Sequence, residues 1–220
     1  MTLLQAAVAE VERLMLDEFR QHPFHNLFFL GLFEKDGVLA GGTCSEKTLA
    51  FQATLQQQGI PARLHQAVIQ GQECHRLLSV KLGQELFYCD IGNGWQSIQL
   101  FPAFCDSAYT AYGIEFEGKV ESTGLVIYQK TNGHRVNSIF IPHQPRPESE
   151  IQQAIEQRFS SGITYPFAQK LRFAQVIGDE FVFLRGCSLQ RFHKTGRYQE
   201  AVFTNQEEAL QWVASVVKNN

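Results

Sequence analysis

The segment CHRLLSVKLGQELFYCDIG, residues 74–92, decides the fold of the middle of the chain. It contains two short runs rich in β-forming residues, separated by Gly83 and Gln84. A glycine fits the first central position of a type II′ turn, which joins two antiparallel strands through two residues. The segment is therefore predicted to be a β-hairpin in which Leu82 faces Glu85.

This register places His75 opposite Gly92 and sets the direction of each side chain. Side chains alternate between the two faces of a strand, so His75 and Asp90 share a face as diagonal neighbours, about 7–8 Å apart at the backbone. An imidazole and a carboxylate can hydrogen-bond across that gap. The same register sends Cys74 and Cys89 to the other face, which argues against a Cys/His metal cluster. A slip of one residue would overturn this prediction.

The first predicted elements of the chain are helices; further along the chain, strands and helices are mixed. Apolar residues recur at helical spacing over residues 3–21, and a second helix is predicted from Cys44 to Gln58, ended by Gly59. The further predictions are a helix over 148–159, strands near 63–69, 119–130, 138–141, 167–176 and 180–189, a proline-rich linker over 142–147, and a closing helix over 205–218. This order indicates an α+β fold rather than a doubly wound α/β sheet.

Cys44 lies where the second helix begins, directly after Gly41-Gly42-Thr43. The N-terminal end of a helix carries partial positive charge, which favours a thiolate. The glycines allow a tight turn and leave room for an acyl group. A cysteine activated by a histidine that a carboxylate orients is the general arrangement for covalent acyl transfer. We therefore predict a catalytic triad of Cys44 as nucleophile, His75 and Asp90.

Each of these three residues alone has a commoner structural explanation. A buried cysteine usually packs, a histidine in a strand is usually structural or exposed, and an aspartate before a glycine usually forms a turn. The predicted hairpin geometry is what associates His75 with Asp90.

Bulk composition excludes several other classes. The chain has 220 residues, a formal net charge of −3 and five cysteines. This charge gives no electrostatic reason to expect nucleic acid or an anionic membrane as a partner. The first basic residue is Arg13, so no signal peptide is expected, and the apolar run 27–33 is too short to span a bilayer. An odd number of cysteines without a C-x-x-C pair fits a cytoplasmic protein without structural zinc.

Around the candidate triad, the sequence resembles the arylamine N-acetyltransferases, a family in the transglutaminase-like cysteine group. The matching segments are Pro23–Leu27 (PFHNL), Gly41–Glu46 (GGTCSE), His75–Val80 (HRLLSV), Tyr88–Gly94 (YCDIGNG) and the later stretch from Tyr165-Pro166-Phe167 to Leu184-Arg185-Gly186. They occur in the family's order and extend over most of the chain.

The resemblance implies an α+β fold with three regions. These are an N-terminal helical bundle over residues 1–62 that carries the nucleophile, a central antiparallel β-barrel over 63–145 that carries the histidine and aspartate, and a C-terminal α/β lid over 146–220.

The resemblance also implies a ping-pong reaction without a bound cofactor or metal. The Cys44 thiolate takes an acyl group, typically acetyl from acetyl-CoA as cosubstrate, and passes it to a small-molecule amine. His75 would act as general base and acid, and Asp90 would hold its tautomer. The expected substrate-binding residues are Phe24, Gly42, Thr43 and Gly92.

Departures from the family pattern leave the substrates open. Ala40 stands where the family has arginine, so Glu46 lacks its expected partner, and Thr48 and Asn93 replace an asparagine and an aromatic residue. One alternative is an amide synthase or hydrolase that uses a carrier-bound acyl chain, from an acyl carrier protein for example, or another acyl donor. A second alternative is a non-catalytic binding relative.

Overall fold

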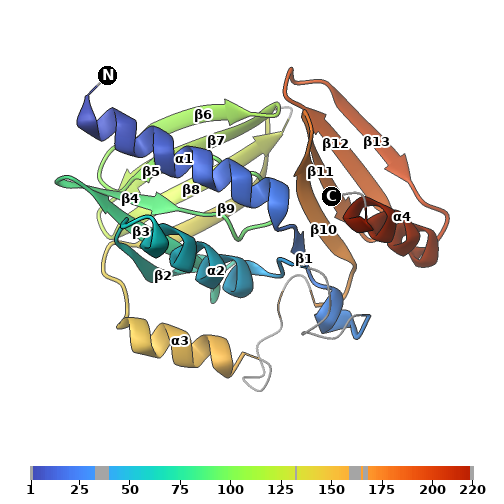
Figure 1. Ribbon diagram of the computed structural model, residues 1–220, viewed down its shortest axis with the longest axis horizontal. Coiled ribbons are helices and arrows are strands. Elements are labelled where there is room, and N and C mark those ends of the chain that lie inside the picture. Colours follow the sequence, from blue (N-terminus) through green and yellow to red (C-terminus); the bar gives the residue numbers. More distant parts are fainter. Residues whose placement is uncertain (1, 33–39, 132, 159–164, 166–167, 219–220) are drawn as a thin grey trace.

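The computed structural model describes residues 2–32, 40–131, 133–158, 165 and 168–218. The helices are α1 (Leu3–Gln21), the short 3₁₀ helix η1 (Leu27–Leu30), α2 (Cys44–Gln57), α3 (Glu148–Glu156) and α4 (Gln206–Lys218). Helices α1 and α2 lie side by side near the start of the chain, and α4 lies at its end (Figure 1). Within the described residues, no helix is long and apolar enough to cross a membrane.

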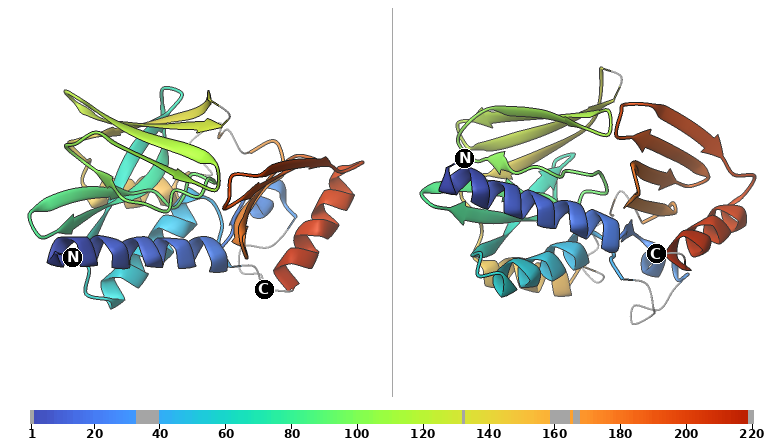
Figure 2. Two further views of the ribbon diagram at one scale, coloured as in Figure 1. Left: turned by 90° about the horizontal axis from the view of Figure 1, so that it is seen from above. Right: turned by 45° about the horizontal axis from the view of Figure 1, so that its top comes forward.

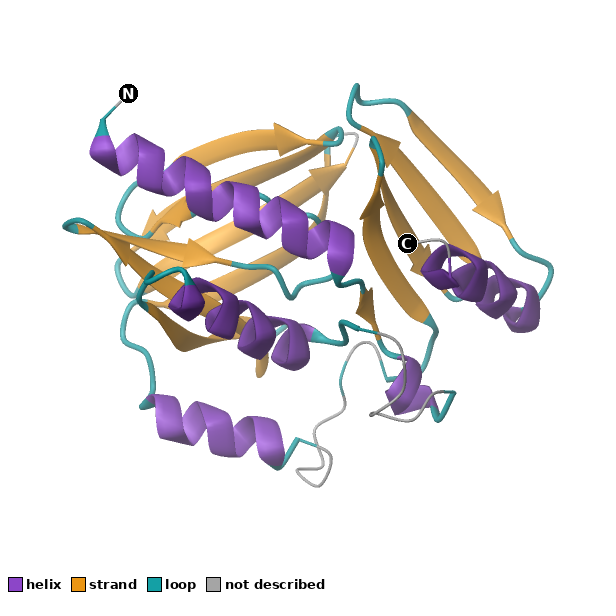
Figure 3. Ribbon diagram, in the orientation of Figure 1, coloured by secondary structure: helices purple, strands orange, loops and turns teal. Residues whose placement is uncertain are grey.

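The larger sheet is antiparallel and curves into a barrel-like shape (Figure 3). In spatial order its strands are β5 (Phe101–Pro102), β4 (Glu85–Cys89), β3 (Gln72–Leu82), β2 (Ala62–Ile69), β9 (His134–Pro142), β8 (Gly124–Thr131), β7 (Ile114–Glu121) and β6 (Ser107–Ala111).

A smaller antiparallel sheet lies beside the barrel. Its strands, in spatial order, are β1 (Phe24–His25), β10 (Arg172–Ile177), β11 (Glu180–Arg185), β12 (Ser188–His193) and β13 (Tyr198–Val202). Strand β1 ties the N-terminal part of the chain to this C-terminal sheet, since Phe24 pairs with Ala174. The α+β fold class predicted from the sequence, with helices, a barrel and a C-terminal α/β layer, is thus confirmed.

The predicted first helix is confirmed, and its sequence explains its position. Thr2 and Gln5 form a capping box at its start. Val11, Met15 and Phe19 follow at intervals of four residues and are at most 2 % exposed. Because each such side chain stabilises the fold by about 1.5–3 kcal/mol when fully buried, this face fixes α1 against the core.

The predicted hairpin also forms in the predicted register. Leu82 pairs with Glu85, and the pairing continues to Leu78 opposite Cys89. Gly83 has φ of 61°, which suits the first central position of a type II′ turn. The alternation of side chains therefore holds up to the end of β4, next to Asp90.

Two predicted strands are wrong because each contains a turn. Residues 180–189 were expected as one strand, but Gly186 adopts φ of 62° and separates β11 from β12. Residues 119–130 likewise divide into β7 and β8 at a tight turn, where Glu121 pairs with Gly124. The strands at 107–111 and 198–202 were not predicted.

The remaining predictions differ mainly at their ends. Helices α2 and α4 match their predicted ranges to within one residue, and Asn205 caps α4 by accepting a hydrogen bond from the Glu208 backbone. The linker over 142–147 is confirmed as a loop apart from its first residue, which ends β9. The predicted end of the third helix at Phe159 and the predicted start of a strand at Phe167 lie outside the described residues.

The core has two parts, one on each face of the small sheet. The face bearing Phe181, Phe183 and Phe192 packs with the barrel and the N-terminal helices. The opposite face, with Phe173 and Leu184, packs against α4, which covers the sheet on the side away from the barrel (Figure 2). The small sheet therefore stands between the barrel and α4 and presents one face toward the barrel.

Candidate active site

A turn that only glycine can occupy leads into α2. Gly41 has φ of 98° and Gly42 φ of 139°, and a Cβ on Gly41 would lie 2.1 Å from the carbonyl oxygen of Pro23. This close approach is part of the pairing between the turn and β1, since the His25 N–H donates to the Gly42 carbonyl at 2.9 Å. The turn delivers Cys44 as the first residue of α2, where the helix dipole favours a thiolate.

Glu46 supports this turn from inside the first turn of α2. One of its carboxylate oxygens accepts hydrogen bonds from the Thr43 backbone N–H at 3.1 Å and from the Thr43 hydroxyl at 2.6 Å. Its other oxygen forms an ion pair with Arg158, just beyond the end of α3. The expectation that Glu46 lacks an arginine partner is therefore wrong, because a guanidinium distant in the sequence takes that place.

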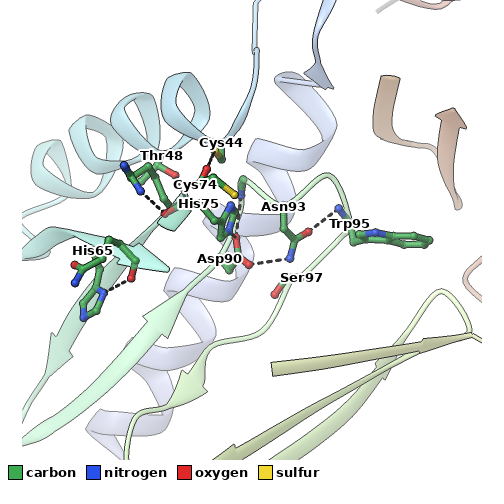
Figure 4. Close-up of polar contacts among 12 residues, drawn as sticks. Cys44, Thr48, His65, Cys74, His75, Asp90, Asn93, Trp95 and Ser97 are labelled. Carbon is green, nitrogen blue, oxygen red and sulfur yellow. Dashed lines mark hydrogen bonds and ion pairs between the residues drawn. The ribbon is translucent and has the colours of Figure 1, made fainter. Parts of the chain in front are cut away.

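His75 and Asp90 meet as the hairpin register predicts. The His75 Nε2 and Asp90 Oδ1 atoms are 2.9 Å apart, in a fully buried setting (Figure 4). The His75 ring points Nε2 at the Asp90 carboxylate, so Nδ1 is the nitrogen that can exchange a proton with Cys44. Asp90 follows the last residue of β4, so the end of this strand sets its position.

Gly92 lets the loop after Asp90 approach Cys44 closely. A Cβ on Gly92 would lie 2.7 Å from Cys44 Cα and 2.8 Å from Cys44 Cβ. Such distances exclude any side chain at this position, so the need for glycine here is steric. The Gly92 N–H also donates to Asp90 Oδ1 at 3.2 Å.

Asn93 completes the hydrogen bonds of the aspartate. Its Nδ2 donates to Asp90 Oδ2 at 2.8 Å, and its Oδ1 accepts from the Trp95 N–H at 2.6 Å (Figure 4). The replacement of an aromatic residue at this position therefore adds a polar contact to Asp90. An asparagine three residues after an aspartate in a glycine-rich loop is the sequence feature that could have indicated it.

Thr48 joins α2, the helix that begins with Cys44, to β3, the strand that carries His75. Its hydroxyl donates to the Arg76 carbonyl at 3.0 Å, one residue beyond His75 (Figure 4). Because Thr48 lies one helical turn after Cys44, this bond fixes α2 relative to β3 at the site.

Electrostatics favour a thiolate–imidazolium pair. Burial raises the pKa of the Cys44 thiol, but the hydrogen bond and charge of His75, together with the backbone and charge of Arg76, bring that pKa below its ordinary value. Burial lowers the pKa of His75, but the charge and hydrogen bond of Asp90 and the interaction with Cys44 outweigh it and raise the pKa to about 10. A thiolate beside an imidazolium is the charge state that nucleophilic attack by a cysteine requires.

The two other buried thiols, Cys74 and Cys89, have pKa values shifted in the opposite direction. Burial raises the pKa of Cys74 and raises that of Cys89 well above its ordinary value. Cys74 was predicted to face away from His75, yet it borders the same cavity, and its carbonyl oxygen lies 3.9 Å from the Cys44 sulfur. Of these three thiols, only Cys44 has a lowered pKa.

A cavity of about 720 Å³ lies between the barrel and the small sheet, and Cys44 and His75 line it. The facing wall comes from the small sheet and includes Phe183, Phe192 and Tyr198. Trp95 stacks on Phe183, with ring centroids 4.5 Å apart and an angle of 20° between the rings. The cavity is large enough for a drug-sized ligand.

The expected substrate-binding residues divide into two groups. Phe24 and Gly92 line the cavity. Gly42 and Thr43 are not among its lining residues and instead form the turn that supports Cys44. In the described part of the chain, no group of three or more His, Cys, Asp or Glu side chains could hold a metal ion.

Two positions near the turn, the buried His25 and the exposed Ala40, differ in charge from the family pattern. His25 and Ala40 stand where the resemblance has glutamate and arginine. Burial is the main cause that lowers the pKa of His25 to about 4, and the charge of Lys47 lowers it further, so the imidazole is neutral at pH 7. At both positions, therefore, a neutral residue has replaced a charged one.

Comparison with known proteins relates the fold to one group of enzymes. No family model matches the chain, and no curated protein matches it. Among solved structures, it is similar to the arylamine N-acetyltransferase of Mycobacterium marinum, at 16 % identity, TM-score 0.79 and coverage of 96 % of this chain and 86 % of that one.

Two further solved structures agree with this result. The arylamine N-acetyltransferase of Salmonella typhimurium matches at 17 % identity and TM-score 0.77, with coverage of 94 % of this chain and 82 % of that one. The M. marinum enzyme in complex with CoA matches at 16 % identity and TM-score 0.78, with coverage of 96 % and 86 %. At these identities the comparison shows a shared fold.

Proposed function

We propose that this protein is an acyltransferase of the arylamine N-acetyltransferase type, in which Cys44, His75 and Asp90 form the catalytic triad. The observation that carries the proposal is the lowered pKa of a cysteine at a helix N-terminus, beside a histidine that is bonded to a buried aspartate at 2.9 Å. The fold shared with the arylamine N-acetyltransferases supports it.

The first half-reaction loads the cysteine. The Cys44 thiolate attacks the carbonyl carbon of an acyl-CoA, the proposed cosubstrate, and the negative charge moves to the carbonyl oxygen. As the first residue of α2, Cys44 has a backbone N–H without a partner inside the helix, which makes it the proposed oxyanion donor. The thiolate of CoA then leaves, and the proton held by the His75 imidazolium neutralises it.

The second half-reaction transfers the acyl group to a small-molecule amine. The amine nitrogen attacks the Cys44 thioester, His75 accepts the amine proton, and the thiolate leaves as the amide forms. Asp90 stabilises the imidazolium at that moment through its bond to Nε2. Two acyl transfers through one thiolate give a ping-pong order.

The three regions of the chain divide this work in the proposal. Residues 1–62 carry the nucleophile, residues 63–145 carry the histidine and the aspartate, and residues 146–220 supply the wall of the cavity that faces them. A substrate in the cavity would contact all three regions.

The test follows the fate of a preformed acyl-enzyme. The protein is loaded with an acetyl group from an activated ester, and loss of that group is timed with and without aromatic amines. We expect the amines to accelerate the loss and to yield the N-acetyl product. Loss to water at one rate regardless of amine would indicate a hydrolase, and failure of Cys44 to load from any donor would favour the non-catalytic binding relative.

A further inference from the structure

The small sheet presents its polar and apolar residues to the cavity in an ordered way. Residues directly opposed on neighbouring strands share a face. One such row contains Arg172, Arg185 and Ser188, and another contains Phe181, Phe192 and Tyr198. The wall of the cavity therefore has a cationic end and an aromatic end.

At the cationic end, two guanidiniums stand directly opposite each other. Arg172 on β10 pairs with Arg185 on β11, and both line the cavity that holds Cys44. Like charges in this position destabilise a sheet. Burial lowers the pKa of Arg172, and the charge of Arg185 lowers it further. The arrangement thus costs stability unless negative charge is present nearby.

No carboxylate of the described cavity wall supplies this negative charge. Among the described residues that line it, there is no aspartate or glutamate. Arg185 is exposed and lies within ion-pair distance of no carboxylate in the described part of the chain. The Glu200 carboxylate, on β13, accepts hydrogen bonds from the hydroxyls of Ser188 and Tyr198.

The charge of the cavity also differs in sign from that of the whole chain, which has a formal net charge of −3. Besides the two arginines, the charged groups of the described cavity wall are the Cys44 thiolate and the His75 imidazolium, whose opposite charges offset each other, so the arginines set the sign of the wall. A cavity lined by one sign of charge concentrates ligands of the other sign. Guanidiniums bind carboxylates and phosphates through two parallel hydrogen bonds.

We propose that Arg172 and Arg185 form an oxyanion-binding subsite that holds the phosphate or carboxylate group of a substrate whose reactive end lies at Cys44. This inference rests on the proposed function and extends it to the class of substrate. The substrate has an anionic group at the arginines and, in the same cavity, an apolar or aromatic part beside Trp95 and Phe183.

The test compares Arg185→Gln with Arg63→Gln, a matched loss of one exposed arginine on β2, away from the cavity. Both changes are made in the Cys44→Ala protein so that no reaction occurs, and binding is measured by calorimetry. The probes are CoA and pantetheine, which differ in their phosphates, and an aminobenzoate and aniline, which differ in a carboxylate.

We expect Arg185→Gln to weaken binding of one anionic probe by about ten- to a hundredfold, the size of a lost charge-assisted hydrogen bond, with its uncharged partner unchanged. A selective loss for CoA assigns the subsite to a phosphate of the acyl donor, and a selective loss for the aminobenzoate assigns it to a carboxylate of the acceptor. Arg185→Lys should restore part of the affinity.

The proposal is wrong if neither anionic probe binds, or if Arg185→Gln and Arg63→Gln affect both anionic probes equally. Acylation of Cys44 by an activated ester without an anionic group separates this outcome from failure of the proposed function. That reaction is run in the wild-type protein and in Arg63→Gln; it depends on the triad alone and should proceed whether or not the two arginines bind an anion.

Discussion

Asp90 accepts three hydrogen bonds in a fully buried setting, and the one from Asn93 reaches the oxygen that His75 does not use. Replacing Asn93 with alanine removes that bond and leaves an acceptor unsatisfied. We expect kcat/KM to fall about tenfold, because an unsatisfied buried group costs about 1–3 kcal/mol.

The change should act on kcat rather than on KM, because Asn93 positions Asp90. Steady-state kinetics of acetyl transfer check this, and the pH profile of Cys44 alkylation should shift in the same variant. A purely structural role would lower the free energy of unfolding without moving the pH profile.

The pH dependence of the Cys44 thiol gives a second prediction at this scale. Because the pKa of Cys44 is lowered, its thiolate should persist below the range of about 8.5 in which an ordinary thiol titrates. Because the pKa of His75 is about 10, the imidazolium is present below that pH and is lost as the pH rises through it. Turnover should therefore fall above about pH 10.

The measurement is the rate of iodoacetamide alkylation at each pH, resolved by peptide mass spectrometry. Cys105 is exposed and serves as an internal comparison. We expect Cys44 to react at neutral pH faster than Cys105 in spite of its burial. Equal pH profiles for the two cysteines would contradict the thiolate–imidazolium pair.

Sequence reasoning at the residue scale succeeded where partners are close along the chain. His75 and Asp90 are 15 residues apart within one hairpin, so turn chemistry and strand alternation were enough to place them together. Arg158 and Glu46 are 112 residues apart, and no local pattern connects them. They meet because the tertiary fold brings the segment just beyond α3 to the first turn of α2.

At the scale of elements, the Arg158–Glu46 ion pair holds the end of α3 against the turn that carries Cys44. The Arg158 side chain is 7 % exposed and that of Glu46 is 19 % exposed. Removing one partner of a buried ion pair leaves the other charge buried without a partner, which can lower the free energy of unfolding by about 3–5 kcal/mol. We expect Arg158→Met to destabilise the protein by about 2–3 kcal/mol, since Glu46 retains some solvent, and to slow alkylation of Cys44.

Arg146→Met is the matched control for this prediction. Arg146 also pairs with carboxylates beside α3, but its side chain is 42 % exposed, so its loss should cost less than about 1 kcal/mol. Denaturant unfolding gives both values. Equal destabilisation by the two changes would show that the buried pair has no special role.

Glycines explain both the successes and the failures of prediction for the elements. Gly59 ends α2 with φ of 71°, and Gly83 turns the hairpin with φ of 61°, as expected. Gly186 was overlooked because it closely follows a run of β-forming residues, Phe181–Leu184. A single glycine within such a run gives no sequence signal that distinguishes a turn from a bulge.

At the scale of the whole molecule, the Trp95 side chain connects the loop after β4 to the small sheet. It stacks on Phe183 and also lies near Phe181 and Phe192. Replacing it with alanine should destabilise the fold by about 3 kcal/mol. It should also admit water to the cavity, so a larger share of the acyl-enzyme should hydrolyse.

Trp212→Ala provides the comparison, because Trp212 lies on α4 and packs against the face of the small sheet that points away from the cavity. It should destabilise the fold without changing the ratio of transferred to hydrolysed acyl groups. Product analysis after a single turnover gives this ratio. An unchanged ratio in Trp95→Ala would mean that Trp95 does not exclude water.

The order of elements along the chain was sufficient to predict the α+β class, but it could not predict the cavity. The cavity forms where the hairpin, the start of α2 and the small sheet meet, and the strands at its far edge were not foreseen in the sequence. The cationic pair of Arg172 and Arg185 likewise depends on a cross-strand register that only the structure shows.

The central claim is that Cys44 carries an acyl group during the reaction, and the intact mass of the protein tests it most directly. After brief incubation with acetyl-CoA, we predict a mass increase of one acetyl group in the wild-type protein, located on Cys44 by peptide mapping. The increase should be absent in Cys44→Ala and should disappear on addition of an aromatic amine. An unmodified Cys44 with every acyl donor, or an adduct that persists in Cys44→Ala, would contradict the claim.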